Sequence, residues 1–190
     1  MLLEVRDINK SFGEKQVLKD VAFSVPGGQA LGLLGRNGAG KTTMIRIIMG
    51  VFDADGGSVL LDGKPIDRSR VKIGYLPEER GLYPKKIISR QLAYFGALKG
   101  MTSSETKEAT EKLLGRLEMS EYLNKKLEVL SKGNQQKIQL AVALLNDPDI
   151  LILDEPFSGL DPVNAMLLKD IVMEMIEKGK IVLFSSHQMN

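Results

Sequence analysis

The stretch GRNGAGKT, residues 35–42, decides how this chain folds. It matches the pattern G-x-x-x-x-G-K-[ST] of a phosphate-binding loop, which requires a buried strand before it and a helix after it. The nearly continuous apolar run QALGLLG, residues 29–35, is typical of a buried strand. Behind the loop, Met44, Ile47 and Ile48 have helical spacing. We therefore predict a strand, a loop and a helix in succession.

Each residue type in this loop has a physical role. Gly35, Gly38 and Gly40 let the backbone bend and bring its N–H groups against phosphate oxygens without a Cβ in the way. The helix that follows points the positive end of its dipole at the same place. We expect Lys41 to contact the β- and γ-phosphates and the hydroxyl of Thr42 to bind Mg²⁺. The expected nucleotide-binding residues of this segment are Gly35, Arg36, Asn37, Gly38, Ala39, Gly40, Lys41, Thr42 and Thr43.

A second apolar run, DILIL at 149–153, leads into two carboxylates, Asp154 and Glu155. Taken alone, such a pair is as consistent with the capping of a turn as with metal binding or acid–base chemistry. The phosphate loop favours the chemical interpretation, because ligands of open parallel sheets bind at the carboxyl ends of strands. Successive strand residues point to opposite sides. We therefore expect Asp154 to bind Mg²⁺ and Glu155 to activate a water molecule beyond the γ-phosphate.

The single histidine of the chain, His187, follows a third apolar run, KIVLFSS at 180–186. A lone histidine is often structural, but this one should emerge at the same edge of the sheet as Asp154. That position is within reach of the γ-phosphate. We expect His187 to act in catalysis together with Glu155 and Lys41.

The alternation of apolar runs with helical patterns predicts an α/β fold with a mostly parallel sheet. The chain begins differently. Residues 2–8 and 17–25 alternate between apolar and polar and are separated by SFGEK, which contains a glycine. This pattern predicts an antiparallel β subdomain at the start of the chain.

The stretch between Lys41 and Asp154 is far longer than the roughly 30 residues of a simple strand–helix–strand unit. Much of it has helical patterns, with Pro84 and Pro148 near the edges. This predicts a helical subdomain inserted into the α/β core. The predicted units are residues 1–86 and 148–190 for the nucleotide-binding core and residues 87–147 for the inserted helical subdomain.

The composition excludes several classes of function. The 190 residues are 43% hydrophobic and 26% charged, and the net charge of +2 comes from interspersed residues, which argues against nucleic-acid binding. The absence of cysteine excludes disulfides, thiolate chemistry and cysteine zinc sites. No apolar run is long enough to cross a bilayer, and the start MLLEVRDINK is not a signal peptide. We expect a cytoplasmic chain that binds no nucleic acid.

The segment LSKGNQQ, residues 130–136, is a second candidate for anion binding. Ser131 is a good helix N-cap, and an apolar helical face follows it. A capped helix start with Gly133 also exposes N–H donors and a positive dipole end, so both interpretations can hold together. The phosphate loop of the chain is already complete, so a second anion site is redundant unless it serves another molecule.

These motifs resemble, in their order along the chain, those of the ATP-binding cassette (ABC) ATPases. GRNGAGKT is similar to the Walker A loop, LILDE to Walker B, LSKGN to the signature loop and SGLD to the D-loop, with His187 as the switch histidine. The resemblance covers essentially the entire chain and implies a P-loop NTPase core. It also implies that Phe12 stacks on adenine and that Glu78, at the Q-loop, contacts the metal. The further nucleotide-binding residues that it implies are Ser131, Gly133, Asn134 and Asp161.

The resemblance also implies cofactors and partners. The cofactors are ATP and Mg²⁺. Two copies would stack head to tail, so that Ser131 and Gly133 of one copy cover the γ-phosphate of the ATP held by the other. Transmembrane permease subunits would recruit the pair to the inner face of the cell membrane. The stretches GYLPEERGLYP and LSKGNQQKIQ resemble the ATPase subunits of bacterial sodium-exporting-type transporters, which implies an ATP-hydrolysing subunit of an exporter.

The chain departs from the family pattern in three places. Glu78 stands where the family usually has glutamine, and its extra negative charge favours stronger metal binding. Lys132 and Asn134 alter the usual signature sequence. The chain stops three residues after His187, whereas family domains continue with further strands and a helix, so we expect a fragment whose core lacks one edge. Phe12 also has an alternative role, since an aromatic residue beside a glycine turn is commonly involved only in packing.

Other functions remain open at this point. A soluble ABC ATPase acting on ribosomes or DNA shares these motifs, although the sequence has neither a second cassette nor a very long coiled coil. A GTPase switch fits the phosphate loop alone, but no N-K-x-D motif follows the loop. A chain that binds nucleotide without hydrolysing it is the remaining alternative.

Overall fold

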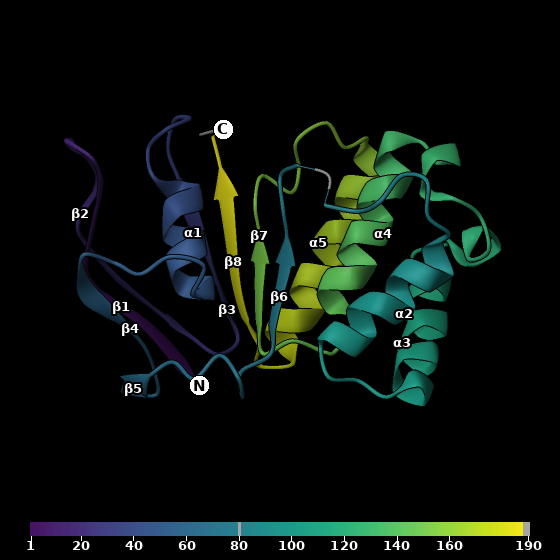
Figure 1. Cartoon of the computed structure of the whole chain (residues 1–190), viewed down its shortest axis with the longest axis horizontal. Coiled ribbons are helices and arrows are strands. Elements are labelled where there is room, and N and C mark those ends of the chain that lie inside the picture. The colour runs from purple at the N-terminus through teal and green to yellow at the C-terminus, as the bar shows by residue number, and fades with distance from the viewer. Residues whose placement is uncertain (80, 188–190) are drawn as a thin grey trace.

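The computed structural model describes residues 1–79 and 81–187 (Figure 1). Within these ranges the chain forms eight strands, five α-helices and two short 3-10 turns at Ser120–Tyr122 and Leu127–Val129. The elements are β1 (Leu2–Phe12), β2 (Lys15–Pro26), β3 (Gln29–Leu34), α1 (Lys41–Met49), β4 (Gly56–Leu61), β5 (Lys64–Pro65), β6 (Ile73–Leu76), α2 (Ile88–Leu98), α3 (Ser103–Arg116), α4 (Lys132–Leu144), β7 (Ile150–Leu153), α5 (Pro162–Glu177) and β8 (Ile181–Ser186).

The chain begins with the predicted antiparallel pair, but its strands are longer than expected. β1 and β2 remain paired up to Phe12 and Lys15, so only two residues connect them, rather than the whole of SFGEK. Gly13 has a φ of 60°, a left-handed conformation that glycine adopts at little cost, and this permits the tight turn. Phe12 is therefore placed at the tip of a hairpin.

Two further strands of the same sheet, β4 and β5, were not predicted, and the strand order is β2-β1-β4-β5. β4 begins with Gly56 and Gly57, which obscure the alternation typical of a strand. A signal was present nevertheless. Asp62 and Gly63, between β4 and β5, have φ values of 53° and 76°, as a tight hairpin turn requires, and Asp-Gly is a strong hairpin pair.

The second sheet is parallel, as predicted, and its strand order is β3-β8-β7-β6, of which β6 was not predicted. β7 is buried on both faces. Ile150 and Ile152 pack with α1 and the antiparallel sheet, whereas Leu151 and Leu153 pack with α4 and α5. α1 consequently lies between the two sheets (Figure 1). This double burial explains why the strand reads as a continuous apolar run.

The helices α2, α3 and α4 follow β6 in the chain and precede β7, and they lie together on the side of the parallel sheet away from the antiparallel one (Figure 1). Leu92, Leu114 and Ile138 are at most 1% exposed and pack these helices against each other and the core. The α/β fold with an antiparallel part and inserted helices is thus confirmed. The exact domain boundaries stay a prediction, and residues 188–190 of the predicted core lie outside the described residues. No helix in the described part of the chain is both long and apolar enough to cross a membrane.

Candidate active site

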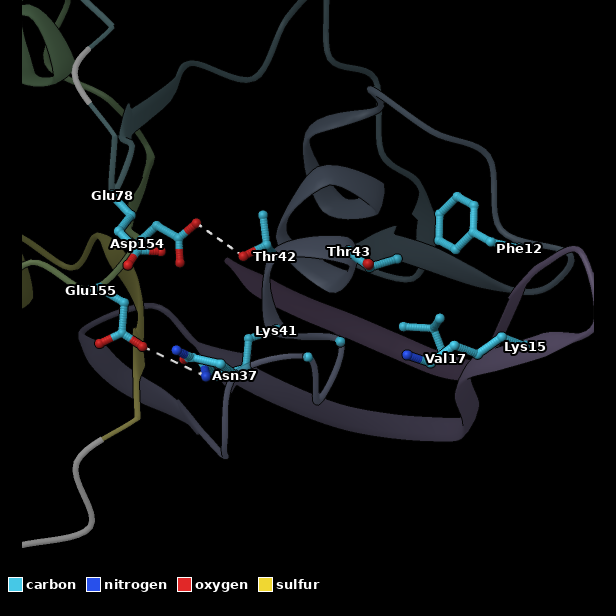
Figure 2. Close-up of a pocket in the computed structure, with 12 residues that line it drawn as sticks. Phe12, Lys15, Val17, Asn37, Lys41, Thr42, Thr43, Glu78, Asp154 and Glu155 are labelled. Carbon is cyan, nitrogen blue, oxygen red and sulfur yellow. Dashed lines mark hydrogen bonds and ion pairs between the residues drawn. The ribbon is translucent and has the colours of Figure 1, made fainter.

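The carboxyl ends of three parallel strands meet at one edge of the sheet. β3 leads into the phosphate loop, β7 into Asp154 and Glu155, and β8 into His187. Beside them is a cavity of about 340 Å³ that extends to the tip of the first hairpin (Figure 2). The residues that line it are Phe12, Lys15, Val17, Asn37, Gly38, Gly40, Lys41, Thr42, Thr43, Glu78, Asp154 and Glu155.

The phosphate loop has a conformation that only glycine permits at one position. Gly40 has a φ of 90°, and a Cβ there would lie 2.7 Å from the side chain of Leu18 and 3.0 Å from the carbonyl oxygen of Val17. The loop therefore packs directly on β2. α1 begins at Lys41 and has no acidic residue in its own first turn, so the positive end of its dipole faces the cavity.

The Lys41 side chain lines the cavity and its ammonium group lies beside Glu155, at the end of the cavity that holds the acids (Figure 2). Its Nζ donates hydrogen bonds to the carbonyl oxygens of Gly35 at 2.5 Å and Arg36 at 3.3 Å, and it lies 3.6 Å from Oε1 of Glu155. Gly35, Arg36 and Ala39 belong to the loop but do not line the cavity. A phosphate group entering here would compete with the loop carbonyls for the same ammonium group.

Asp154 is 3% exposed and accepts hydrogen bonds from three hydroxyl groups. Thr42 Oγ1 lies 3.4 Å and the Tyr75 hydroxyl 3.3 Å from Oδ2, and Ser185 Oγ lies 2.5 Å from Oδ1. Asp154 and Thr42 of the phosphate loop thus line the same cavity. Burial, and then the neighbouring Asp154 carboxylate, raises the pKa of Tyr75 to about 12, so its hydroxyl remains a donor at neutral pH.

Glu155 points into the cavity, but the alternation of side chains along a strand is not the reason. β7 ends at Leu153, and Glu155 has a φ of 50°, so a turn in the backbone, not the pleat of a strand, separates the two acids. The prediction that strand alternation points Asp154 and Glu155 in different directions is therefore wrong. Oε2 lies 2.8 Å from Nδ1 of His187. Oε1 is buried without a hydrogen-bond partner in the described part of the chain, and Lys41 is its nearby cation.

Phe12 lies at the opposite end of the cavity from the acids (Figure 2). The residue is 48% exposed, and its ring forms a T-shaped contact with Phe52, with 5.8 Å between ring centroids. Lys10 Nζ lies 5.6 Å from the same ring. An exposed aromatic ring that is held in place by such contacts is suited to stacking on a flat base. Lys15 and Val17 complete this end of the cavity.

The oxygen ligands near the phosphate loop fit Mg²⁺. Among residues 1–79 and 81–187, no group of three or more His, Cys, Asp or Glu residues is arranged to hold a metal on its own. Mg²⁺ is commonly bound by one or two carboxylates together with substrate phosphates, so a self-sufficient cluster is not required. Asp154 Oδ2 and Thr42 Oγ1 face each other beside the cavity, and Glu78 also lines it.

Besides Gly35, Arg36 and Ala39, four predicted binding residues from outside the loop do not line the cavity of their own chain: Ser131, Gly133, Asn134 and Asp161. Ser131 caps α4 by accepting a hydrogen bond from Asn134 N at 3.3 Å. Asp161 caps α5 by accepting one from Asn164 N at 3.0 Å, and this bond contributes most to holding the pKa of the Asp161 carboxyl below its usual value. A Cβ on Gly133 would lie 3.7 Å from Oδ2 of Asp161, so the two capped helix starts are neighbours.

Four residues of the site were not predicted from the sequence: Lys15, Val17, Tyr75 and Ser185. Lys15 and Val17 could have been found from the hairpin, because Lys15 pairs with Phe12. Ser185 could have been found two positions before His187, at the carboxyl end of a strand. No local pattern indicated Tyr75, because its role depends on β6 lying beside β7.

Comparisons with known proteins agree with this geometry. Residues 18–158 match the ABC transporter family. The chain is 48% identical over 189 residues to the uncharacterised ABC transporter ATP-binding protein YhaQ of Bacillus subtilis, and 46% identical over 187 residues to the uncharacterised ABC transporter ATP-binding protein MJ1023 of Methanocaldococcus jannaschii.

These matches cover nearly all of this chain, 99% and 98%, but only 63% and 68% of the two relatives. Among solved structures, an ATP-binding subunit of an ABC transporter superposes with a TM-score of 0.87 at 32% identity. That alignment covers 98% of this chain and 80% of the other.

Proposed function

The chain belongs to the ABC transporter family, in its ATP-binding part, and we propose that it binds ATP with Mg²⁺ in the cavity described above and hydrolyses it. One observation carries the proposal. Phe12, the phosphate loop and the adjacent acids Asp154 and Glu155 come from three distant parts of the sequence and line a single cavity. An aromatic ring at one end and an ammonium group with two acids at the other match the chemistry of a nucleoside triphosphate.

Each residue has a distinct part in the proposed reaction. The N–H groups of the loop and Lys41 hold the phosphates, and Lys41 exchanges its bonds to the loop carbonyls for bonds to phosphate oxygens. Thr42 and Asp154, with Glu78 close by, would hold Mg²⁺, which offsets the charge that develops on the phosphates. Glu155 accepts the proton of the attacking water, and His187 orients its carboxylate through Oε2.

The proposal extends to partners. Ser131, Gly133 and Asn134 do not line their own cavity, which supports a role on the nucleotide of a second copy in a head-to-tail dimer. The dimer would drive transmembrane permease subunits from the cytoplasmic face of the membrane. The most specific part of the proposal is that the transporter exports its substrate, as the resemblance of GYLPEERGLYP and LSKGNQQKIQ implies.

Two substitutions test the ATPase assignment. In Glu155→Gln, we expect phosphate release to fall by roughly 10²- to 10⁴-fold, the usual contribution of a general base, while ATP still binds. In Lys41→Ala, we expect ATP affinity to fall by roughly 10- to 100-fold, because hydrogen bonds to a charged group contribute about 1.5–3 kcal/mol. Lys107→Ala is the matched control, because the Lys107 side chain on α3 is 79% exposed. Unchanged ATP affinity in Lys41→Ala would overturn the proposal.

A separate experiment tests the transport assignment. Affinity-tagged chain is isolated from detergent-solubilised membranes of its own host, and the multi-span membrane proteins that accompany it are identified. Association with a permease, and a rise in ATP hydrolysis when that permease is present, are expected. ATP hydrolysis that only ribosomes or DNA stimulate would contradict transport and favour a soluble ABC ATPase.

A further inference from the structure

The hydroxyl of Ser185 joins the two acids of the active site. Ser185 lies near the end of β8 and is 0% exposed. Its Oγ lies 2.5 Å from Oδ1 of Asp154 and 2.9 Å from the backbone nitrogen of Glu155. The buried Oγ of Ser185 is therefore hydrogen-bonded both to the side chain of Asp154 and to the backbone of Glu155.

The chemistry of the two partners fixes the direction of both hydrogen bonds. The backbone N–H of Glu155 can only donate, so Ser185 Oγ accepts that bond. The ionised carboxylate of Asp154 can only accept, so the single hydroxyl proton is directed at Oδ1. A hydroxyl group meets both demands at once, because it carries one proton and two lone pairs.

This arrangement sets the orientation of the Asp154 carboxylate. With Oδ1 held by Ser185, the other oxygen, Oδ2, faces Thr42 at 3.4 Å and the Tyr75 hydroxyl at 3.3 Å. Oδ2 is thereby kept beside the Thr42 hydroxyl, the second expected metal ligand. Without the bond to Ser185, the Asp154 carboxylate would keep the two longer hydrogen bonds, which hold its orientation less firmly.

The same hydroxyl supports an unusual backbone conformation at Glu155. A φ of 50° is uncommon for a residue other than glycine, and such conformations persist where the surroundings enforce them. The bond from Glu155 N to Ser185 is one such constraint. It helps to keep Oε1 of Glu155 3.6 Å from Lys41.

We propose that Ser185 is a positioning residue that sets Asp154 for metal binding in the nucleotide complex and, through the backbone of Glu155, sets the second acid. The inference rests on the proposed function, because it concerns the same site. Groups that orient a metal ligand typically contribute 10- to 100-fold to metal affinity or activity. The loss of the Ser185 hydroxyl therefore weakens metal binding at least about tenfold.

The experiment measures metal affinity directly. Mn²⁺ is titrated into the chain saturated with ADP, and free Mn²⁺ is followed by electron paramagnetic resonance. In Ser185→Ala, we expect the Mn²⁺ dissociation constant to rise by about tenfold or more, while ADP affinity measured in EDTA stays unchanged. Ser185→Thr keeps the hydroxyl and restores Mn²⁺ affinity. Ser58→Ala removes an exposed strand hydroxyl from the other sheet and serves as the control.

The outcomes separate this inference from the proposed function. If the unaltered chain binds no adenine nucleotide, the proposed function fails, and the role of Ser185 fails with it. If the unaltered chain binds ADP and Mn²⁺ and Ser185→Ala binds Mn²⁺ equally well, only the role of Ser185 is overturned. Equal losses of Mn²⁺ affinity and of ADP affinity in EDTA indicate a general structural defect and also overturn it. Should Ser185→Ala unfold, Ser185→Cys retains the approximate size with a weak donor and carries the same expectation.

Discussion

Nδ1 of His187 lies 2.8 Å from Oε2 of Glu155, although 32 positions separate the two residues in the chain. The contact joins the end of β8 to the turn that follows β7, its parallel neighbour. On the other side of the same carboxylate, Oε1 lies 3.6 Å from the ammonium group of Lys41. The acid is thus held between an imidazole and a cation.

The contact predicts a turnover defect without a binding defect in His187→Ala. Glu155 would lose the group that fixes Oε2, and phosphate release should fall by roughly 10²-fold, the lower range for acid–base effects. ATP affinity should stay unchanged, because His187 does not line the cavity. Steady-state phosphate release and equilibrium ATP binding are the two measurements. A loss of affinity equal to the loss of turnover would contradict this role.

Phe12 is predicted to bind the base and not the phosphates. In Phe12→Ala, ATP affinity should fall roughly 5- to 150-fold, because stacking of one base on an aromatic ring contributes about 1–3 kcal/mol. Competition by inorganic triphosphate, which has no base, should not change. Phe12→Trp retains an aromatic face and is the matched variant. If ATP and triphosphate weaken together in Phe12→Ala, the ring only supports the packing of the hairpin.

Ser131 is predicted to act on a second copy of the chain. The substitution Ser131→Asp preserves the helix cap of α4, since aspartate is as good an N-cap as serine. It would also place a negative charge against the phosphates held by the partner. In the Glu155→Gln background, we expect ATP to induce a dimer that Ser131→Asp abolishes, as measured by light scattering after size-exclusion chromatography. ATP affinity of the monomer is the control and should be retained.

The free energy of unfolding is predicted to depend on pH through Tyr75. Burial and the Asp154 carboxylate raise the pKa of Tyr75 to about 12, above the usual value of about 10 for tyrosine. The unfolded chain therefore releases this proton at a lower pH than the folded chain. The free energy of unfolding should fall as the pH rises from about 10 to about 12, and Tyr75→Phe should remove that part of the decline.

Ultraviolet absorbance checks the same prediction, because ionised tyrosine absorbs at longer wavelength. The chain has four tyrosines. We expect Tyr75→Phe to remove the transition with the highest midpoint from the alkaline titration. If the highest midpoint persists in that variant, the Tyr75 hydroxyl is not shielded as the structure indicates.

Local sequence patterns predicted much of the fold. The phosphate loop, the apolar runs before it and before the acids, and the inserted helices all depend on neighbouring residues, whose side-chain periodicity follows backbone geometry. The edge at which His187 and Asp154 meet was also predictable, because parallel strands bring their carboxyl ends together. β4 and β5 were missed because glycines obscure the alternation of β4, although the Asp62–Gly63 turn was a usable signal.

The sequence by itself determined that this chain has a phosphate loop, two acids and a histidine at one edge of a parallel sheet. Only the tertiary structure decided which atoms hold these groups in place. The bonds from Ser185 and Tyr75 to Asp154 join residues that are 31 and 79 positions apart. Such contacts depend on the register of neighbouring strands and on the left-handed turn at Glu155, and both are set by packing of the entire core. No pattern among adjacent residues encodes them.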